Sequence, residues 1–153
     1  MTPLTGFLTG LGYKPIPLTR APSGHLAFAT AQVAGRTASL YLDTGAGQTV
    51  LDLGFARGLG LPLRAVELKG AGAGGGGLAL FHAILPRLVL AEWVETEVPC
   101  KAMDLGHVNA GLRARGLAPM DGIIGGDLLQ RREAVIDYRQ SVLFLRSGAE
   151  ATA

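Results

Sequence analysis

The feature that most constrains this chain is a pair of glycine turns about eighty residues apart. The first, Leu42-Asp43-Thr44-Gly45-Ala46, places one aspartate on a tight turn directly after an apolar strand. The second, Gly122-Ile123-Ile124-Gly125, repeats the apolar-apolar-glycine pattern but carries Ile123 in the place that matches Asp43. The pattern is that of one half of a two-carboxylate site. The other half would have to come from a second copy of the chain.

Length and composition favour one domain that hides apolar surface at an interface. The 153 residues suffice for a single core, and 48% of them are apolar, whereas only 17% are charged. A small chain with few charges tends to cover its apolar surface, and a subunit interface is the simplest place to do so. The 23 glycines indicate many turns and close backbone approaches.

Charge and cysteine content argue against several classes of protein. The net charge is only +2 and the arginines are scattered, so there is no reason to expect a nucleic-acid partner. No apolar stretch reaches the roughly eighteen residues that a membrane span requires. Residues 1–12 lack the charged region and cleavage site of a secretory signal, and the single Cys100 cannot form an intrachain disulfide. We therefore expect a cytoplasmic location and no membrane span.

Short apolar runs separated by turn residues predict a mainly β domain. The expected strands cover residues 25–33, 37–42, 49–51, 65–69, 78–83, 88–90, 98–103, 123–124, 134–138 and 142–145. The first two should form a hairpin over residues 25–42, and the fourth and fifth should form a hairpin whose tip is the glycine run at 70–77.

Helical segments are expected to be few and short. Asp52 can cap a helix over residues 53–59, and Asp127 can cap one over 128–132. A further short helix is expected over 107–113, and residues 7–11 are expected to form one helical turn followed by extended chain.

Four features in a fixed order carry a resemblance to a known family. They are the Asp43-Thr44-Gly45-Ala46 turn after its apolar strand, the glycine-rich hairpin, the turn and helix over residues 122–129, and the closing hairpin that begins at Val135. In this order and spacing the chain resembles a retropepsin-like aspartic protease, in the single-domain form found in bacteria as well as in retroviruses.

The resemblance implies the fold and the domain organisation. It covers residues 25–146, preceded by an N-terminal arm (1–24) and followed by a C-terminal tail (147–153). The implied fold is a single-lobe, closed β-barrel of acid-protease type with one or two short helices.

The resemblance also implies a role for each residue of the first turn. Asp43 would be the catalytic carboxylate, contributed once by each subunit of a homodimer. Thr44 would hydrogen-bond to the equivalent loop of the partner, and Gly45 would let the backbone approach the substrate. Together with Ala46 they would form the active-site loop.

Two further segments receive roles from the same resemblance. The tip of the glycine-rich hairpin would be a flap that closes over the substrate; its residues are Gly72, Ala73, Gly74, Gly75 and Gly76. Ile123, Ile124 and Gly125 would form the second turn, packed behind the active-site loop. Many viral members brace their dimer with an Asp and an Arg at the places where this chain has Gly47 and Gly126, so that brace is absent here.

The chemistry that this arrangement implies is peptide hydrolysis by an activated water. Two carboxylates held about 3 Å apart share one proton, so that one can take a proton from water while the other hydrogen-bonds the scissile carbonyl. The substrate would be a peptide or protein, and neither a metal nor a cofactor is required. A peptide-binding or dimerisation module with the same fold and no catalysis is the alternative.

Other interpretations of single motifs are weaker. Residues 70–75 satisfy the dinucleotide-binding glycine pattern, but the glycines continue and Pro86 follows, so the required helix is missing. A glycine loop without a lid role remains an alternative for this run. Cys100 is expected to be buried and inert, and the three histidines lack metal-ligand spacing. Trp93 is expected in a loop or an edge strand.

Overall fold

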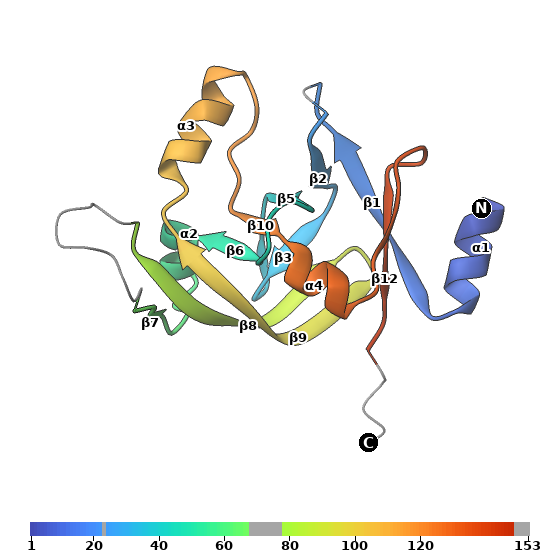
Figure 1. Cartoon of the computed structure of the whole chain (residues 1–153), viewed down its shortest axis with the longest axis horizontal. Coiled ribbons are helices and arrows are strands. Elements are labelled where there is room, and N and C mark those ends of the chain that lie inside the picture. Colours follow the sequence, from blue (N-terminus) through green and yellow to red (C-terminus); the bar gives the residue numbers. More distant parts are fainter. Residues whose placement is uncertain (23, 68–77, 149–153) are drawn as a thin grey trace.

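A computed structural model describes residues 1–22, 24–67 and 78–148, and its strands form one curled sheet (Figure 1). The strands are β1 (Tyr13–Arg20), β2 (Leu26–Phe28), β3 (Ala31–Val33), β4 (Arg36–Thr37), β5 (Leu40–Leu42), β6 (Val50–Asp52), β7 (Arg64–Ala65), β8 (Leu80–Leu90), β9 (Trp93–Met103), β10 (Gly122–Ile124), β11 (Val135–Asp137) and β12 (Val142–Arg146). Their order is β11-β12-β1-β2-β5-β10-β6-β9-β8-β3-β4, and β7 pairs with β8. The expected mainly β architecture is confirmed, and the sheet curls around its core as a half-barrel.

Four short helices accompany the sheet in the described part of the chain, near the four segments expected from the residues and more than the one or two that the resemblance implies. They are α1 (Pro3–Gly10), α2 (Leu53–Gly58), α3 (Gly106–Ala114) and α4 (Gly126–Arg131). Asp52 caps α2 as expected, because its carboxylate accepts a hydrogen bond from the Phe55 amide. α1 starts earlier than expected, since the Thr2 hydroxyl caps it and Pro3 suits a first helical position. None of these helices is long and apolar enough to cross a membrane.

The middle of the sheet joins segments that are far apart in the sequence. β10 lies between β5, to which it is parallel, and β6, to which it is antiparallel. Ile124 pairs with Leu42, the residue before Asp43. A Cβ on Gly122 would lie 2.7 Å from the carbonyl oxygen of Val50, so only glycine fits between the two neighbouring strands. This pairing places the two glycine turns of the sequence side by side.

The expected hairpin over residues 25–42 is present but divided in two. β2 pairs with β5, as in Ala27 opposite Tyr41, and β3 pairs with β4 in a register shifted by one residue. Ala34 and Gly35 turn the inner hairpin with positive φ angles of 50° and 80°, as a type I′ turn requires. β3 also pairs with β8, and this pairing continues the curved sheet around the core.

β8 and β9 form one long hairpin where shorter, separate strands were expected. The ladder continues on both sides of Pro86, which has no N–H to donate, and Glu97 opposite it has a φ of 54°. Buried positions are odd-numbered before Pro86, as at Leu85, and even-numbered after it, as at Leu88. The hairpin therefore presents a different face to the core on either side of Pro86. Because the alternation of apolar and polar residues changes phase there, the sequence does not read as one long strand.

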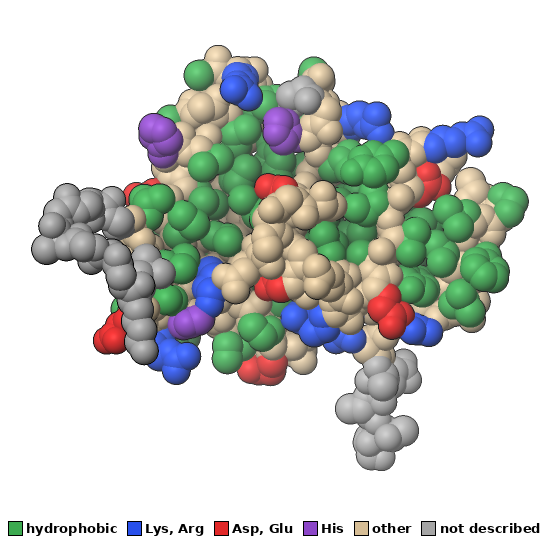
Figure 2. Space-filling view, in the orientation of Figure 1, with side chains coloured by type: hydrophobic (Ala, Val, Ile, Leu, Met, Phe, Trp, Pro, Cys, Tyr) green, Lys and Arg blue, Asp and Glu red, His purple; other side chains and the backbone are tan. Residues whose placement is uncertain are grey.

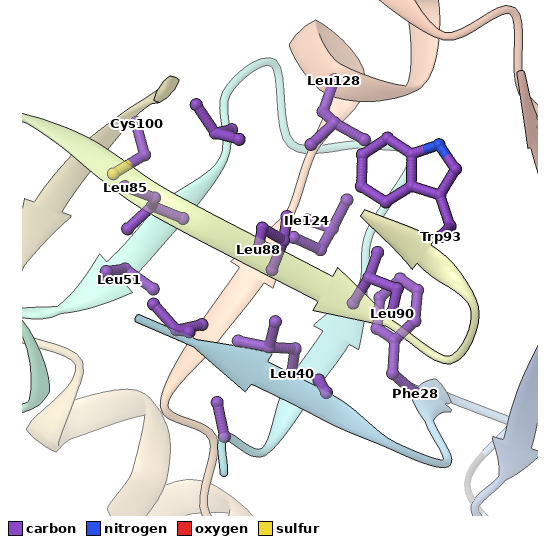
Figure 3. Packing of buried hydrophobic residues seen from close by; sticks show 14 of the residues in the cluster. Phe28, Leu40, Leu51, Leu85, Leu88, Leu90, Trp93, Cys100, Ile124 and Leu128 are labelled. Carbon is purple, nitrogen blue, oxygen red and sulfur yellow. The ribbon is translucent and has the colours of Figure 1, made fainter. Parts of the chain in front are cut away.

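The main core lies inside the curl of the sheet (Figure 3). Leu88 and Leu90 of β8 lie close to Leu40 of β5 and Ile124 of β10 in this cluster. Trp93 also belongs to it, because it is only 1% exposed and its indole nitrogen donates to the carbonyl of Arg146 at 3.3 Å. The expectation of a loop or edge-strand tryptophan is wrong.

Candidate active site

Asp43 lies at the start of the loop that connects β5 to β6, and it is exposed. Its Oδ1 accepts a hydrogen bond from the Gly45 amide at 2.9 Å, and its carbonyl accepts one from the Ala46 amide at 3.2 Å. These two bonds close a tight turn of the kind that aspartate favours. The turn holds the carboxylate at the surface, where a second molecule can reach it.

The second glycine turn supports this loop from behind. The Asp43 amide donates to the carbonyl of Ile124 at 3.1 Å, and the Gly126 amide donates to the carbonyl of Ala46 at 2.7 Å. A Cβ on Gly125 would lie 2.3 Å from the carbonyl oxygen of Gln48, so the close contact between the two turns requires glycine. The backbones of the two turns are thus in direct contact.

Asp127 and Thr49 form a second connection between the same two segments. Asp127 Oδ1 accepts hydrogen bonds from the amide and the hydroxyl of Thr49, both at 2.8 Å, and from the Leu128 amide. The Thr49 hydroxyl in turn accepts from the Gly125 amide at 3.2 Å, and Thr49 is fully buried. The expectation that Asp127 caps a helix over 128–132 is wrong. Gly125 is the N-cap of α4, without a side-chain bond, and Asp127 lies in its first turn.

Thr44 lies beside a groove that adjoins the Asp43 loop. The groove has a volume of about 330 Å³ and is lined mainly by α4 and the residues after it, including Leu129 and Ile136. Ile136 belongs to β11, which stands at the end of the strand order. Thr44 itself is exposed, so this groove and the loop face solvent together.

The expected flap residues at 72–76 lie outside the described residues. The chain on either side of them is paired, because Ala65 of β7 faces Phe81 of β8 and the Val66 amide donates to the Leu80 carbonyl at 2.8 Å. The described parts of these flanking segments therefore pair as the two sides of a hairpin, whereas residues 68 and 69 of the expected strand 65–69 lie outside the described residues.

Two other titratable residues noted in the sequence, Cys100 and His82, have pKa values that are shifted by their surroundings. Cys100 is buried, and this burial, with the carboxylate of Asp127 as a second cause, raises the pKa of its thiol to about 12. Partial burial and then the charges of Lys101 and Arg64 lower the pKa of His82. No group of three or more His, Cys, Asp or Glu side chains that could hold a metal ion occurs among the described residues.

The structure thus brings together Asp43, Gly45 and Ala46 with Ile124 and Gly125. Ile123 pairs with Tyr41 and Val50, so its side chain lies on the sheet face opposite to that of Ile124. The Thr49–Asp127 connection was missed, although a threonine six residues after Asp43 and an aspartate two residues after Gly125 were visible in the sequence. Their pairing depends on the register of β10 between β5 and β6.

Comparison with known proteins agrees with this geometry. A family profile described as aspartyl protease matches residues 29–128, which is more than half of the chain. Comparison with curated protein sequences gives no match.

Solved structures show the same fold. A retropepsin-like aspartic protease from Rickettsia conorii superposes with a TM-score of 0.57 at 20% identity, over 88% of this chain and 90% of that one. The retroviral protease-like domain of Ddi1 from Leishmania major gives 0.50 at 17% identity, over 81% and 94%. With its single Asp-Thr-Gly turn, braced from behind by a second glycine turn, the chain belongs to the aspartyl protease family and has the retropepsin-like fold.

Proposed function

We propose that this protein is an aspartic endopeptidase whose catalytic pair consists of Asp43 from each of two identical subunits. The observation that carries the proposal is the asymmetry of the two glycine turns. Asp43 is exposed on one turn, whereas the equivalent place on the other turn holds Ile123, and Asp127 is engaged with Thr49. One chain therefore supplies one carboxylate, and a second copy would supply the other.

The chemistry follows from placing two such carboxylates together. Two carboxylates about 3 Å apart do not both ionise, so the pair holds one proton and titrates as a unit. The ionised member takes a proton from a water molecule as that water attacks the scissile carbonyl carbon. The protonated member donates a hydrogen bond to the carbonyl oxygen, and the tetrahedral intermediate then collapses as the amine leaves with a proton.

The surroundings of the loop are consistent with this dimer. Thr44 is exposed beside Asp43, and the groove next to it leads along α4 to β11. β11 pairs with β12 on one side only in the described part of the sheet. An unpaired strand edge is a surface that a second chain can cover, and the adjoining groove offers both apolar and polar contacts, since Leu129 and Glu133 both line it. We place the dimer contact there.

The test is cleavage of a diverse peptide pool by the wild-type protein and by Asp43→Asn. We expect the variant to fold and to lose cleavage. Asp104→Asn is the matched control, because Asp104 Oδ1 accepts from the Gly106 amide in the same local geometry on another loop. Activity retained in Asp43→Asn would refute the proposal.

A mixing experiment tests the shared site separately. Excess inactive Asp43→Asn subunits should convert wild-type homodimers into mixed dimers with one carboxylate, so wild-type activity should fall as the excess rises. Activity that does not respond to the excess would exclude a site built from two copies. A protein that dimerises and binds peptides but cleaves none would be the non-catalytic module instead.

A further inference from the structure

A row of basic side chains crosses the three strands next to the candidate site. Arg64 of β7 faces His82 of β8, and His82 faces Lys101 of β9. Directly paired residues project from the same face of a sheet, so these three side chains lie next to one another. Figure 2 shows histidine and Lys or Arg side chains gathered over β7 and β8.

The same row continues to the strands that carry the active-site loop. Lys101 is paired with Val50 of β6, Val50 with Ile123 of β10, and Ile123 with Tyr41 of β5, two residues before Asp43. Neighbouring strands are spaced about 4.8 Å apart, so Lys101 lies roughly 14 Å from Tyr41 along this face. Nearer to Asp43 this face is covered, because Tyr41 and Ile123 pack with Leu112 of α3 in a second apolar cluster, and the basic row lies beyond that cluster.

A hollow connects the row to the active-site loop. It has a volume of about 230 Å³, and its lining includes Gln48 at the end of that loop together with Arg64, His82 and Lys101. The backbone amide of Lys101 also donates to the Thr49 carbonyl at 2.9 Å. The hollow is thus bounded on one side by the loop of Asp43 and on the other by the basic row.

Among the described residues, Arg64 and Lys101 of this row form no ion pair with a carboxylate. Lys101 Nζ lies 2.6 Å from His82 Nδ1, a contact in which the ammonium donates to a neutral imidazole. The ion pairs of the described residues involve other basic side chains: Arg131, Arg132 and Arg146. Residues 68–77 contain no Asp or Glu that could serve. Arg64 and Lys101 therefore stand on either side of an uncharged His82, and no ion pair offsets their positive charges among the described residues.

Two carboxylates stand at the borders of the row. Asp127 lines the same hollow, but one of its oxygens is occupied by three donors from Thr49 and Leu128. Glu97 lines an adjoining outer hollow with Arg64 and His82. Neither forms an ion pair with Arg64 or Lys101 among the described residues. The ammonium and the guanidinium thus remain available to an anionic group that enters from the cleft.

We infer that this hollow is a subsite for an acidic side chain of the peptide substrate, with Lys101 and Arg64 binding the carboxylate and His82 orienting the ammonium. The inference rests on the proposed function. An extended peptide advances about 3.3 Å per residue, and a lysine side chain reaches several ångströms toward it. The acidic residue should therefore stand roughly two to five residues from the cleaved bond.

The experiment compares peptides that differ only in Asp or Glu against Asn or Gln at these positions. We expect the acidic peptides to have a kcat/KM about tenfold higher, mainly through KM, because a charge-assisted bond away from the reacting atoms acts on binding. Lys101→Met should remove most of this preference, and Lys101→Glu should reverse it in favour of basic peptides. Lys14→Met, on the exposed side of β1, is the matched control and should keep the preference.

Binding to the Asp43→Asn variant separates this inference from the proposed function. If the protein cleaves nothing but Asp43→Asn binds acidic peptides more tightly, and loses this on Lys101→Met, the subsite stands and the endopeptidase proposal fails. Cleavage without acidic preference, or a preference unchanged in Lys101→Met, overturns the subsite and leaves the endopeptidase. A protein that neither cleaves nor binds peptides overturns both.

Discussion

The buried hydroxyl of Thr49 allows a sharp test of how the two glycine turns are held together. Thr49→Val keeps the shape of the side chain but removes the donor to Asp127 and the acceptor of the Gly125 amide. An unpaired buried amide destabilises a fold by about 1–3 kcal/mol, and the carboxylate loses one of three donors, worth about 1 kcal/mol. The expected loss is therefore about 2–4 kcal/mol of unfolding free energy.

Thr49→Ser is the matched control for this variant. It keeps the hydroxyl and loses only a buried methyl group, so its expected loss is about 1 kcal/mol. Urea unfolding followed by tryptophan fluorescence measures both, since Trp93 is the one tryptophan of the chain and lies in the core. In thermal unfolding, Thr49→Val should melt about 4–16 °C below the wild type. If the two variants unfold at the same denaturant concentration, the hydroxyl does not connect the turns as argued.

Two further predictions concern charge. In the native state the pKa of the Cys100 thiol is raised to about 12, whereas the thiol of the unfolded chain ionises above about pH 9. Because only the unfolded state loses this proton between these pH values, the free energy of unfolding should fall as pH rises from 9 toward 12. A thiol reagent at pH 8 should label Cys100 in urea but not in the native protein, and rapid native labelling would contradict its burial. Glu95 binds Arg132 through both carboxylate oxygens at 2.7 and 3.1 Å, so Glu95→Gln should destabilise by about 1–3 kcal/mol in urea unfolding. Glu133→Gln, which breaks the exposed pair with Arg146, should change stability by less than about 1 kcal/mol, and equal losses in the two variants would refute the distinction.

Local sequence signals were sufficient for much of the fold. Asp52 stands before a short apolar run and caps α2, and the Ala34-Gly35 pair turns a hairpin, as their local chemistry predicts. The apolar runs at β5 and β10 were both recognised as strands. In each case the determining interactions lie within a few residues of one another.

The errors share a different cause. Trp93 stands beside Glu92 and close to Glu95, so its segment looks exposed, yet the long β8–β9 hairpin turns the tryptophan into the core. Asp127 stands at a plausible capping position but bonds to Thr49, a residue 78 positions earlier. The basic row formed by Arg64, His82 and Lys101 likewise exists only through strand register. Interactions of this kind depend on pairing across long stretches of chain, which spacing within a segment does not specify.

The position of β10 between β5 and β6 has a consequence for biosynthesis. Even the Ser39 amide, just before β5, donates its hydrogen bond to the carboxylate of Asp121, which lies 82 residues further along the chain. A nascent chain that has emerged only as far as β9 therefore contains the Asp43 segment without the strand that fixes its shape. Because contacts of long sequence separation form slowly, we expect the loop to mature among the last elements, after the ribosome has translated past α4. Shorter truncation products would then carry the Asp-Thr-Gly sequence but no organised turn.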